Sequence, residues 1–78
     1  MHDFIPLEML SAGQTARIAA ICGDPDDTHR LEELGLRQGQ LVEMVQPGIP
    51  CVLKLAGSKL CFRGGQLTGV LVELGDHL

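Results

Sequence analysis

The sequence contains no tryptophan and no tyrosine, and phenylalanine occurs only twice. A chain with so few aromatic side chains has no platform for the stacking of bases, which single-stranded nucleic-acid binders use. Basic residues are also scarce. The sequence has 6 Lys and Arg and 10 Asp and Glu, which gives a formal net charge of -4. Phosphate backbones and anionic lipid surfaces repel such a chain. We therefore expect no nucleic-acid partner.

The three cysteines, Cys22, Cys51 and Cys61, are odd in number and have no C-x-x-C spacing. A disulfide framework or a zinc ribbon is therefore not expected. We interpret the cysteines as buried, reduced thiols of a cytosolic protein. An alternative function is a transition-metal carrier or sensor that uses these cysteines and His29 as ligands. Their separation in sequence neither supports nor excludes such a site, and we assign no metal and no cofactor.

Long apolar runs are absent as well. The N-terminus has no basic segment before an apolar run, so no signal peptide is expected. No stretch approaches the ~20 apolar residues of a membrane helix, so we expect a cytoplasmic protein that does not insert into the membrane. With 78 residues the chain is predicted to form one domain, residues 1–78. A domain of this size buries only roughly 60% of its unfolded surface, so its core must be compact.

The clearest structural signal is the start of a helix over about residues 25–34. Asp24 is a candidate N-cap, because its carboxylate can accept a hydrogen bond from the free amides of the first turn. Pro25 falls at the first helical position, where a missing N–H costs nothing. Asp26 and Asp27 add negative charge at the positive end of the helix dipole. These residues together predict that a helix begins here.

The end of this helix is equally well marked. Leu31 and Leu34 are three residues apart and indicate one apolar face. Gly35 follows, where a left-handed residue commonly ends a helix. Leu36 is placed to fold back onto Leu31 in a Schellman motif.

The rest of the chain shows the alternation and turn residues of short strands. Residues 37–40 fit a type II turn with Gly39 at the position of positive φ, and Gly57–Ser58 fits a type II′ hairpin turn. Strands are predicted at 14–22, 41–45, 51–56, 59–63 and 69–74. In the strands after the helix, the side chains predicted to face inward are Val42, Met44, Leu53, Leu55, Leu60, Phe62, Val70 and Val72.

One helix among about five short strands favours a mainly β fold, a small antiparallel barrel with one inserted helix. A βαβ unit that opens with the first strand and the helix is the alternative. Residues 64–66 are expected to form a bend or one turn of 3₁₀ helix, and the tail from residue 75 is expected to fray.

No catalytic constellation is present, and we assign no catalytic residue. Ser11 and Ser58 lie in glycine turns without the signature of a nucleophile elbow. The candidates for function are instead partner contacts at Leu36, Arg37 and Gln38. Arg37 lies at the tip of a turn beside Leu36, which we expect to be exposed.

The pattern Arg30–Leu31–Glu32–Glu33–Leu34–Gly35–Leu36–x–x–Gly39–x–x–Val42 resembles the FeoA family, small cytosolic accessory proteins of bacterial ferrous iron transport. The layout is similar across nearly the whole chain, including Leu60–x–Phe62–Arg63 before a final valine-rich strand. The resemblance implies an SH3-like barrel with a helix inserted after the first strand. It also implies contact with FeoB, a membrane transporter with a cytosolic G-protein domain, and no established catalytic activity. A weak homo-oligomer is compatible with this interpretation.

Overall fold

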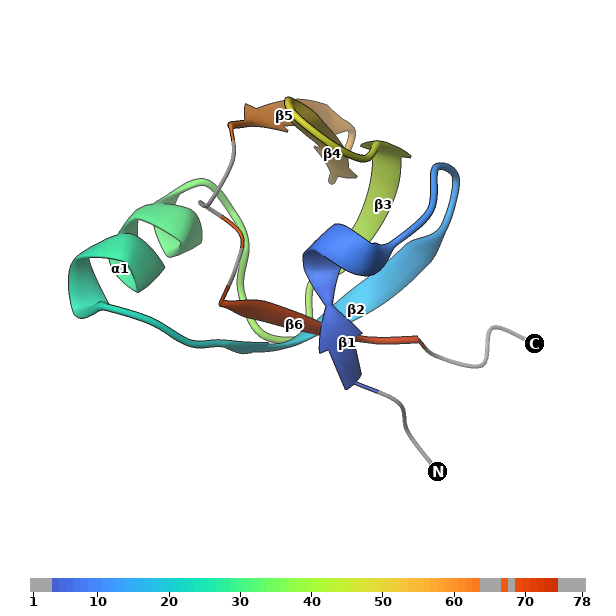
Figure 1. The fold of residues 1–78 in the computed structure, drawn as a ribbon. Helices are drawn as coiled ribbons and strands as arrows, with labels where there is room; N and C mark the ends of the chain where they lie inside the picture. The colour runs from blue at the N-terminus through green and yellow to red at the C-terminus, as the bar shows by residue number, and fades with distance from the viewer. Residues whose placement is uncertain (1–3, 64–66, 68, 75–78) are drawn as a thin grey trace.

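The computed structural model describes residues 4–63, 67 and 69–74. Within these residues the chain forms one α-helix, one short 3₁₀ helix and six strands (Figure 1). In chain order they are β1 (Phe4–Pro6), the 3₁₀ helix η1 (Leu7–Met9), β2 (Thr15–Ile21), α1 (Pro25–Glu33), β3 (Leu41–Gln46), β4 (Cys51–Leu55), β5 (Ser58–Phe62) and β6 (Val70–Glu73).

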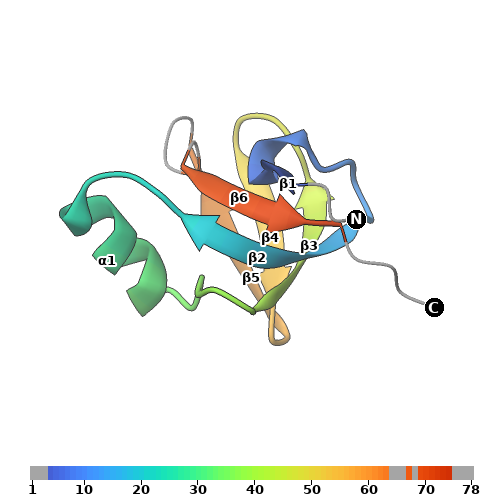
Figure 2. The same ribbon diagram turned by 90° about the horizontal axis from the view of Figure 1, so that it is seen from below.

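All strand pairs are antiparallel, in the order β1-β6-β2-β3-β4-β5. The sheet curls around one core, and α1 lies to one side of it (Figures 1 and 2). This confirms the mainly β fold with one inserted helix. The βαβ alternative is wrong, because β2 and β3 flank α1 in the sequence and yet pair directly as antiparallel neighbours.

The core is made mostly of aliphatic side chains, from the strands, η1, α1 and the segments that connect them, and it contains no buried polar residue among those described. Alternation along β3 and β4 buries Val42, Met44, Leu53 and Leu55 as predicted. In β5 and β6, Phe62, Val70 and Val72 are buried, and Leu60 is half-buried against the core. The core therefore follows the period-two pattern of the sequence.

The hairpin between β4 and β5 turns one residue earlier than predicted. The two turn residues are Ala56 and Gly57, with φ of 48° and 87°, and Ser58 already pairs with Leu55. Positive φ at both central residues is the type I′ turn, whose twist matches that of the flanking strands. The prediction of a type II′ turn at Gly57–Ser58 is therefore wrong.

Strand β1 was not predicted from the sequence. It has three residues, and among the described strands it pairs with β6 alone, where Phe4 lies opposite Glu73. A segment this short shows no period, and Pro6 is acceptable because β1 lies at the edge of the sheet. The predicted bend at 64–66 and the tail from residue 75 lie outside the described residues. No described helix has the length and the apolar character to cross a membrane.

The end of β2 meets the start of β6 through a close backbone contact. The backbone N–H of Cys22 donates to the carbonyl oxygen of Gly69 over 2.7 Å. A Cβ atom on Gly69 would lie only 1.8 Å from the carbonyl oxygen of Cys22. No side chain at residue 69 can be accommodated without separating the two backbones.

We expect Gly69→Ala to lower the free energy of unfolding by about 3 kcal/mol, because the added methyl group collides with main chain. Thermal unfolding followed by circular dichroism should show a fall in Tm of more than about 10 °C. Gly13→Ala is the control, because Gly13 has φ of +88° but nothing within 4 Å of a Cβ. A Gly69→Ala variant no less stable than Gly13→Ala would contradict the close contact.

Candidate functional site

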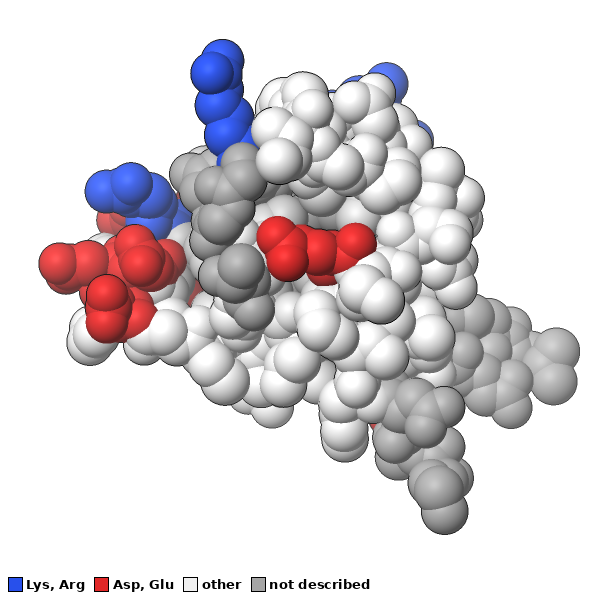
Figure 3. All heavy atoms as spheres, viewed as in Figure 1, with Lys and Arg blue, Asp and Glu red and all other residues white. Residues whose placement is uncertain are grey.

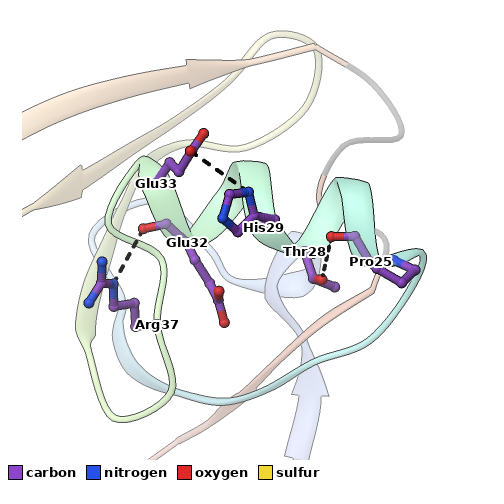
Figure 4. A network of polar contacts seen from close by, with 6 residues as sticks. All are labelled: Pro25, Thr28, His29, Glu32, Glu33 and Arg37. Atoms are coloured by element: carbon purple, nitrogen blue, oxygen red, sulfur yellow. Dashed lines mark hydrogen bonds and ion pairs between the residues drawn. The ribbon is translucent and has the colours of Figure 1, made fainter.

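The helix α1 begins where the sequence predicts, with Asp24 at the N-cap and Pro25 in the first turn. The proposed hydrogen bond from the helix amides to the Asp24 carboxylate is absent, so that detail is wrong. Instead, Thr28 donates from its hydroxyl to the carbonyl oxygen of Pro25 over 3.0 Å (Figure 4). Asp26 and Asp27 therefore stabilise the helix through their negative charge, which interacts favourably with the positive end of the helix dipole.

The helix ends in the predicted Schellman motif. Leu36 N–H donates to the carbonyl oxygen of Leu31, and Gly35 N–H donates to that of Glu32, both over 3.0 Å. Gly35 adopts a φ of +105°, which reverses the chain direction. Both hydrogen bonds that define the motif are present.

The prediction that Leu36 is exposed is wrong. Leu36 is 0% exposed and belongs to the core with Leu31, whereas Leu34 is 45% exposed. The reversal at Gly35 carries the following residue back over the helix, so Leu36 fills the apolar space that Leu34 was expected to share. Leu36 therefore cannot present its side chain to a partner, and Leu34 is the exposed leucine at this helix end.

The turn that follows is fastened to β2. Gln40 N–H donates to the carbonyl oxygen of Arg37 over 3.0 Å, and Gly39 has φ of +91°, as a type II turn requires. Gly39 N–H then donates to the carbonyl oxygen of Ile18 over 2.7 Å, and Ile18 N–H donates to that of Gln40 over 2.9 Å. These two reciprocal bonds hold the turn against the middle of the sheet.

Two guanidinium groups lie on either side of this turn. Arg17 donates from Nη1 to the carbonyl oxygen of Gly39 over 2.9 Å. Arg37 donates from Nε to the carbonyl oxygen of Glu32 over 3.4 Å (Figure 4). Both acceptors are neutral, and neither guanidinium forms an ion pair within the part of the chain that the structure describes. The hydrogen bonds orient both positive charges, and Glu73 of β6 lies directly across from Arg17 in the sheet.

Exposed apolar groups accompany these charges. Leu34 precedes the turn, and Leu41, which is 46% exposed, lies directly across from Arg17 in the sheet. Gln38 is exposed at the tip of the turn. We name the set Arg17, Leu34, Arg37, Gln38 and Leu41 the turn surface.

A hollow of about 320 Å³ borders the turn surface. It lies between the start of β3 and the turn that joins β4 to β5, and Gln40, Leu41, Lys54 and Gly57 are among its lining residues. Cations, an amide and apolar side chains on a fixed backbone are suited to contact with another protein.

The cysteines are not all buried as predicted, because Cys22 and Cys61 are exposed and only Cys51 is buried. All three are free thiols. No three His, Cys, Asp or Glu side chains among the described residues gather as metal ligands. His29 lies on the exposed face of α1, with Nδ1 3.7 Å from Oε2 of Glu33 (Figure 4).

The buried thiol of Cys51 packs against sulfur rather than against a polar group. Its Sγ lies 3.8 Å from Sδ of Met44. Burial raises the pKa of the Cys51 thiol above its usual value, and the negative charge of Glu8 adds to the shift. A thiol must lose its proton to bind a metal or to attack an electrophile, so Cys51 is poorly suited to either role.

We expect iodoacetamide at neutral pH to modify Cys22 and Cys61 at least about tenfold faster than Cys51, because attack requires an accessible thiolate. Mass spectrometry of peptides from a time course measures the three rates separately. The same reaction in denaturant is the control, in which the three rates should converge. Labelling of Cys51 in the folded protein as fast as that of Cys61 would show that its thiol is accessible.

We expect Gly35→Val to destabilise the fold by about 2 kcal/mol, because a β-branched residue resists positive φ. Open space surrounds the position, so the loss is conformational and not steric. Gly35→Asn should cost less, since asparagine tolerates this region better. Equal midpoints for both variants in urea unfolding would show that Gly35 does not control the helix end.

Comparison with known proteins places these features in a family. The FeoA domain model matches residues 5–74, which is nearly the whole chain. No match is found among curated proteins.

Solved structures of FeoA proteins have the same fold as this chain. The FeoA protein from Chlorobium tepidum is 27% identical, with a TM-score of 0.81 over 92% of this chain and 71% of that one. A FeoA described as an iron uptake regulatory protein is 20% identical, with a TM-score of 0.85 over 92% of this chain and 100% of that one.

The zinc complex of Stenotrophomonas maltophilia FeoA, described as a prokaryotic SH3 domain protein, is 23% identical, with a TM-score of 0.76 over 87% of this chain and 88% of that one. The SH3-like architecture implied by the sequence resemblance is therefore confirmed. Since the family model covers the barrel, the helix and its glycine end together, this chain belongs to the FeoA family.

Proposed function

We propose that this protein is a cytoplasmic accessory protein of ferrous iron transport that acts by binding the cytosolic side of a FeoB-type membrane transporter. Membership of the FeoA family supports the link to iron transport. The description of one similar structure as an iron uptake regulatory protein agrees with a regulatory role. For the Stenotrophomonas maltophilia relative, action as a ferrous iron transport activating factor has been suggested.

The observation that carries the proposal is the turn surface. Its backbone is fixed by the Schellman motif on one side and by the two bonds to Ile18 on the other. Each of its guanidinium groups donates to a neutral carbonyl oxygen, which orients the positive charge. A surface that is ordered before binding loses little conformational entropy when a partner arrives. Arg37 and Gln38 remain the proposed contacts, and Leu34 replaces the buried Leu36.

The proposed mode of action is protein contact and not catalysis. Ser11 lies in the turn before β2, where its N–H bonds to Oε1 of Gln14 over 2.7 Å, and Ser58 begins β5. Within the described residues, neither serine hydroxyl is hydrogen-bonded to a base that could activate it. The turn surface offers charge and apolar area, which are means of recognition.

The metal-carrier alternative has less support. Although the Stenotrophomonas maltophilia relative was solved with zinc, Cys22, His29, Cys51 and Cys61 do not form a three-ligand group in the described part of this chain. Burial also keeps the Cys51 thiol protonated. We therefore retain protein contact as the single proposed function.

We expect Arg37→Glu to weaken binding to the purified cytosolic domain of a FeoB-type transporter at least about tenfold, which corresponds to about 1.4 kcal/mol. Replacing the guanidinium by a carboxylate turns an attraction into a repulsion. Gln38→Ala should cause a smaller loss. Isothermal titration calorimetry measures both.

Gln14→Glu is the control, because it adds one carboxylate in the exposed turn before β2 and keeps an oxygen that can accept the Ser11 N–H. It should leave the affinity unchanged. Equal affinities of Arg37→Glu and the original protein would remove the turn surface from the proposal. Absence of binding by the original protein would overturn the proposed function itself.

A further inference from the structure

Strand β5 forms one edge of the sheet. It pairs with β4 on one side, and no described strand pairs with its other side. It stands at the upper margin of the barrel in Figure 1, away from α1. An edge strand exposes a row of backbone donors and acceptors on which another strand can build.

The register identifies which backbone groups point outward. The two-residue turn makes Leu55 and Ser58 a hydrogen-bonded pair, and antiparallel pairs alternate along the ladder from there. Leu60, opposite Leu53, is then bonded to β4, whereas Lys59 and Cys61 direct their N–H and C=O groups away from it. The outer edge of β5 therefore offers four backbone groups in the spacing of one further antiparallel strand.

The side chains beside this edge have an unbalanced charge. Glu43, Lys54 and Lys59 lie directly across from one another on three successive strands. Side chains in this relation are within about 5.5 Å at Cβ, and like charges directly opposite are unfavourable. The negative charge of Glu43 lies beside Lys54 and not beside Lys59, so the neighbour of Lys59 on β4 is a second lysine. Neither ammonium has an ion-pair partner in the described part of the chain.

The wider charge distribution points the same way. Five of the 10 acidic residues fall between Asp24 and Glu33, and none falls between Glu43 and Glu73. The second interval holds three of the 6 basic residues. In Figure 3 acidic side chains gather over α1, whereas basic side chains stand at the upper margin over β4 and β5. An acidic ligand is thus drawn to β5, although the whole molecule is negative.

A hollow adjoins the far end of the same edge. It measures about 290 Å³ and is lined by Ile49, Pro50, Cys61 and Arg63. Ile49 is 80% exposed, so the hollow has an apolar wall open to solvent. Cys61 follows Lys59 by two residues, on the same face of β5. Along this face of β5, the ammonium of Lys59 is therefore followed two residues later by the hollow beside Cys61.

We propose that the outer edge of β5 binds an acidic, extended segment of a partner protein, which adds to the sheet as a further strand. Its main chain bonds to Lys59 and Cys61. A carboxylate opposite Lys59 continues the charge row that begins at Glu43, and an apolar side chain two residues away fills the hollow beside Ile49. This mode of recognition is strand addition to a sheet edge. It uses a surface other than the turn surface and does not depend on it.

The test uses a short, capped, threonine-rich peptide in which one glutamate is followed two residues later by a valine, and a matched peptide with lysine in place of that glutamate. Amide hydrogen exchange of the full chain is followed by NMR at a saturating peptide concentration. The acidic peptide should slow exchange at Lys59 and Cys61 at least about tenfold, with little change at Leu60, which is already bonded. The lysine peptide should have no such effect.

Two variants at Cys61 separate the backbone from the side chain. Cys61→Pro removes the thiol and an outward N–H but no hydrogen bond between β4 and β5, at a position where an edge strand tolerates proline, and it should abolish the protection of Lys59. Cys61→Ala removes the thiol, keeps the N–H and should retain the protection. Lys59→Glu, an exposed substitution that does not alter the ladder, should reverse the preference between the two peptides.

Protection of Lys59 and Cys61 by the acidic peptide alone, lost in Cys61→Pro and kept in Cys61→Ala, supports the proposal. Absence of protection at this edge, or equal protection by both peptides, overturns it. Amide shifts at Lys59 and Cys61 that grow with protein concentration and without peptide also overturn it, since a second copy would then occupy the edge. None of these outcomes bears on Arg37 or on transporter binding.

Discussion

The reciprocal hydrogen bonds between Ile18 and the turn at residues 37–40 are the constraint on which the rest of the molecule depends. They bring the chain back to β2 after the connection through α1, so that β3 starts beside β2 in the correct register. A one-residue slip would expose the apolar face of β3, because side chains alternate between the two faces. The Schellman end of α1 prepares this closure, since it directs Leu36 into the core and sets the start of the turn.

Because the closure fixes backbone, it also fixes the surface outside it. Arg17 donates to the carbonyl oxygen of Gly39 in the closing turn, and Arg37 donates to that of Glu32 in α1, so backbone groups at both ends of this segment orient the two cations. The acidic residues of α1 lie on one side of the barrel and the lysines of β4 and β5 on another. A small domain can in this way offer two different faces for contact, because each charge is held by a separate element.

Sequence reasoning succeeded where the determinants were local. The helix from Pro25, its end at Gly35 and the inward residues of β3 and β4 were all predicted. It failed locally at the hairpin turn of Ala56 and Gly57 and at the Asp24 side-chain bond, and otherwise where a distant segment decides the outcome. Strand β1 exists only because β6 pairs with it, and the exposed state of Cys22 and Cys61 follows from their places after β2 and on the outer face of β5. Of the candidate site, Arg37 and Gln38 lie exposed as expected, while Leu34 and Leu36 exchanged their roles.

The sequence by itself determined the helix start, the helix end at Gly35, the turn at Gly39 and the alternation that makes a barrel, because proline, glycine and apolar period act over a few residues. Only the tertiary structure decided which leucine at the helix end is buried, since Leu36 enters a core shared with strands distant in the sequence. It also decided that Gly69 must lack a side chain, because the obstacle is the carbonyl of Cys22. Contacts between distant segments leave no local pattern in the sequence, and they complete both the core and the surfaces around it.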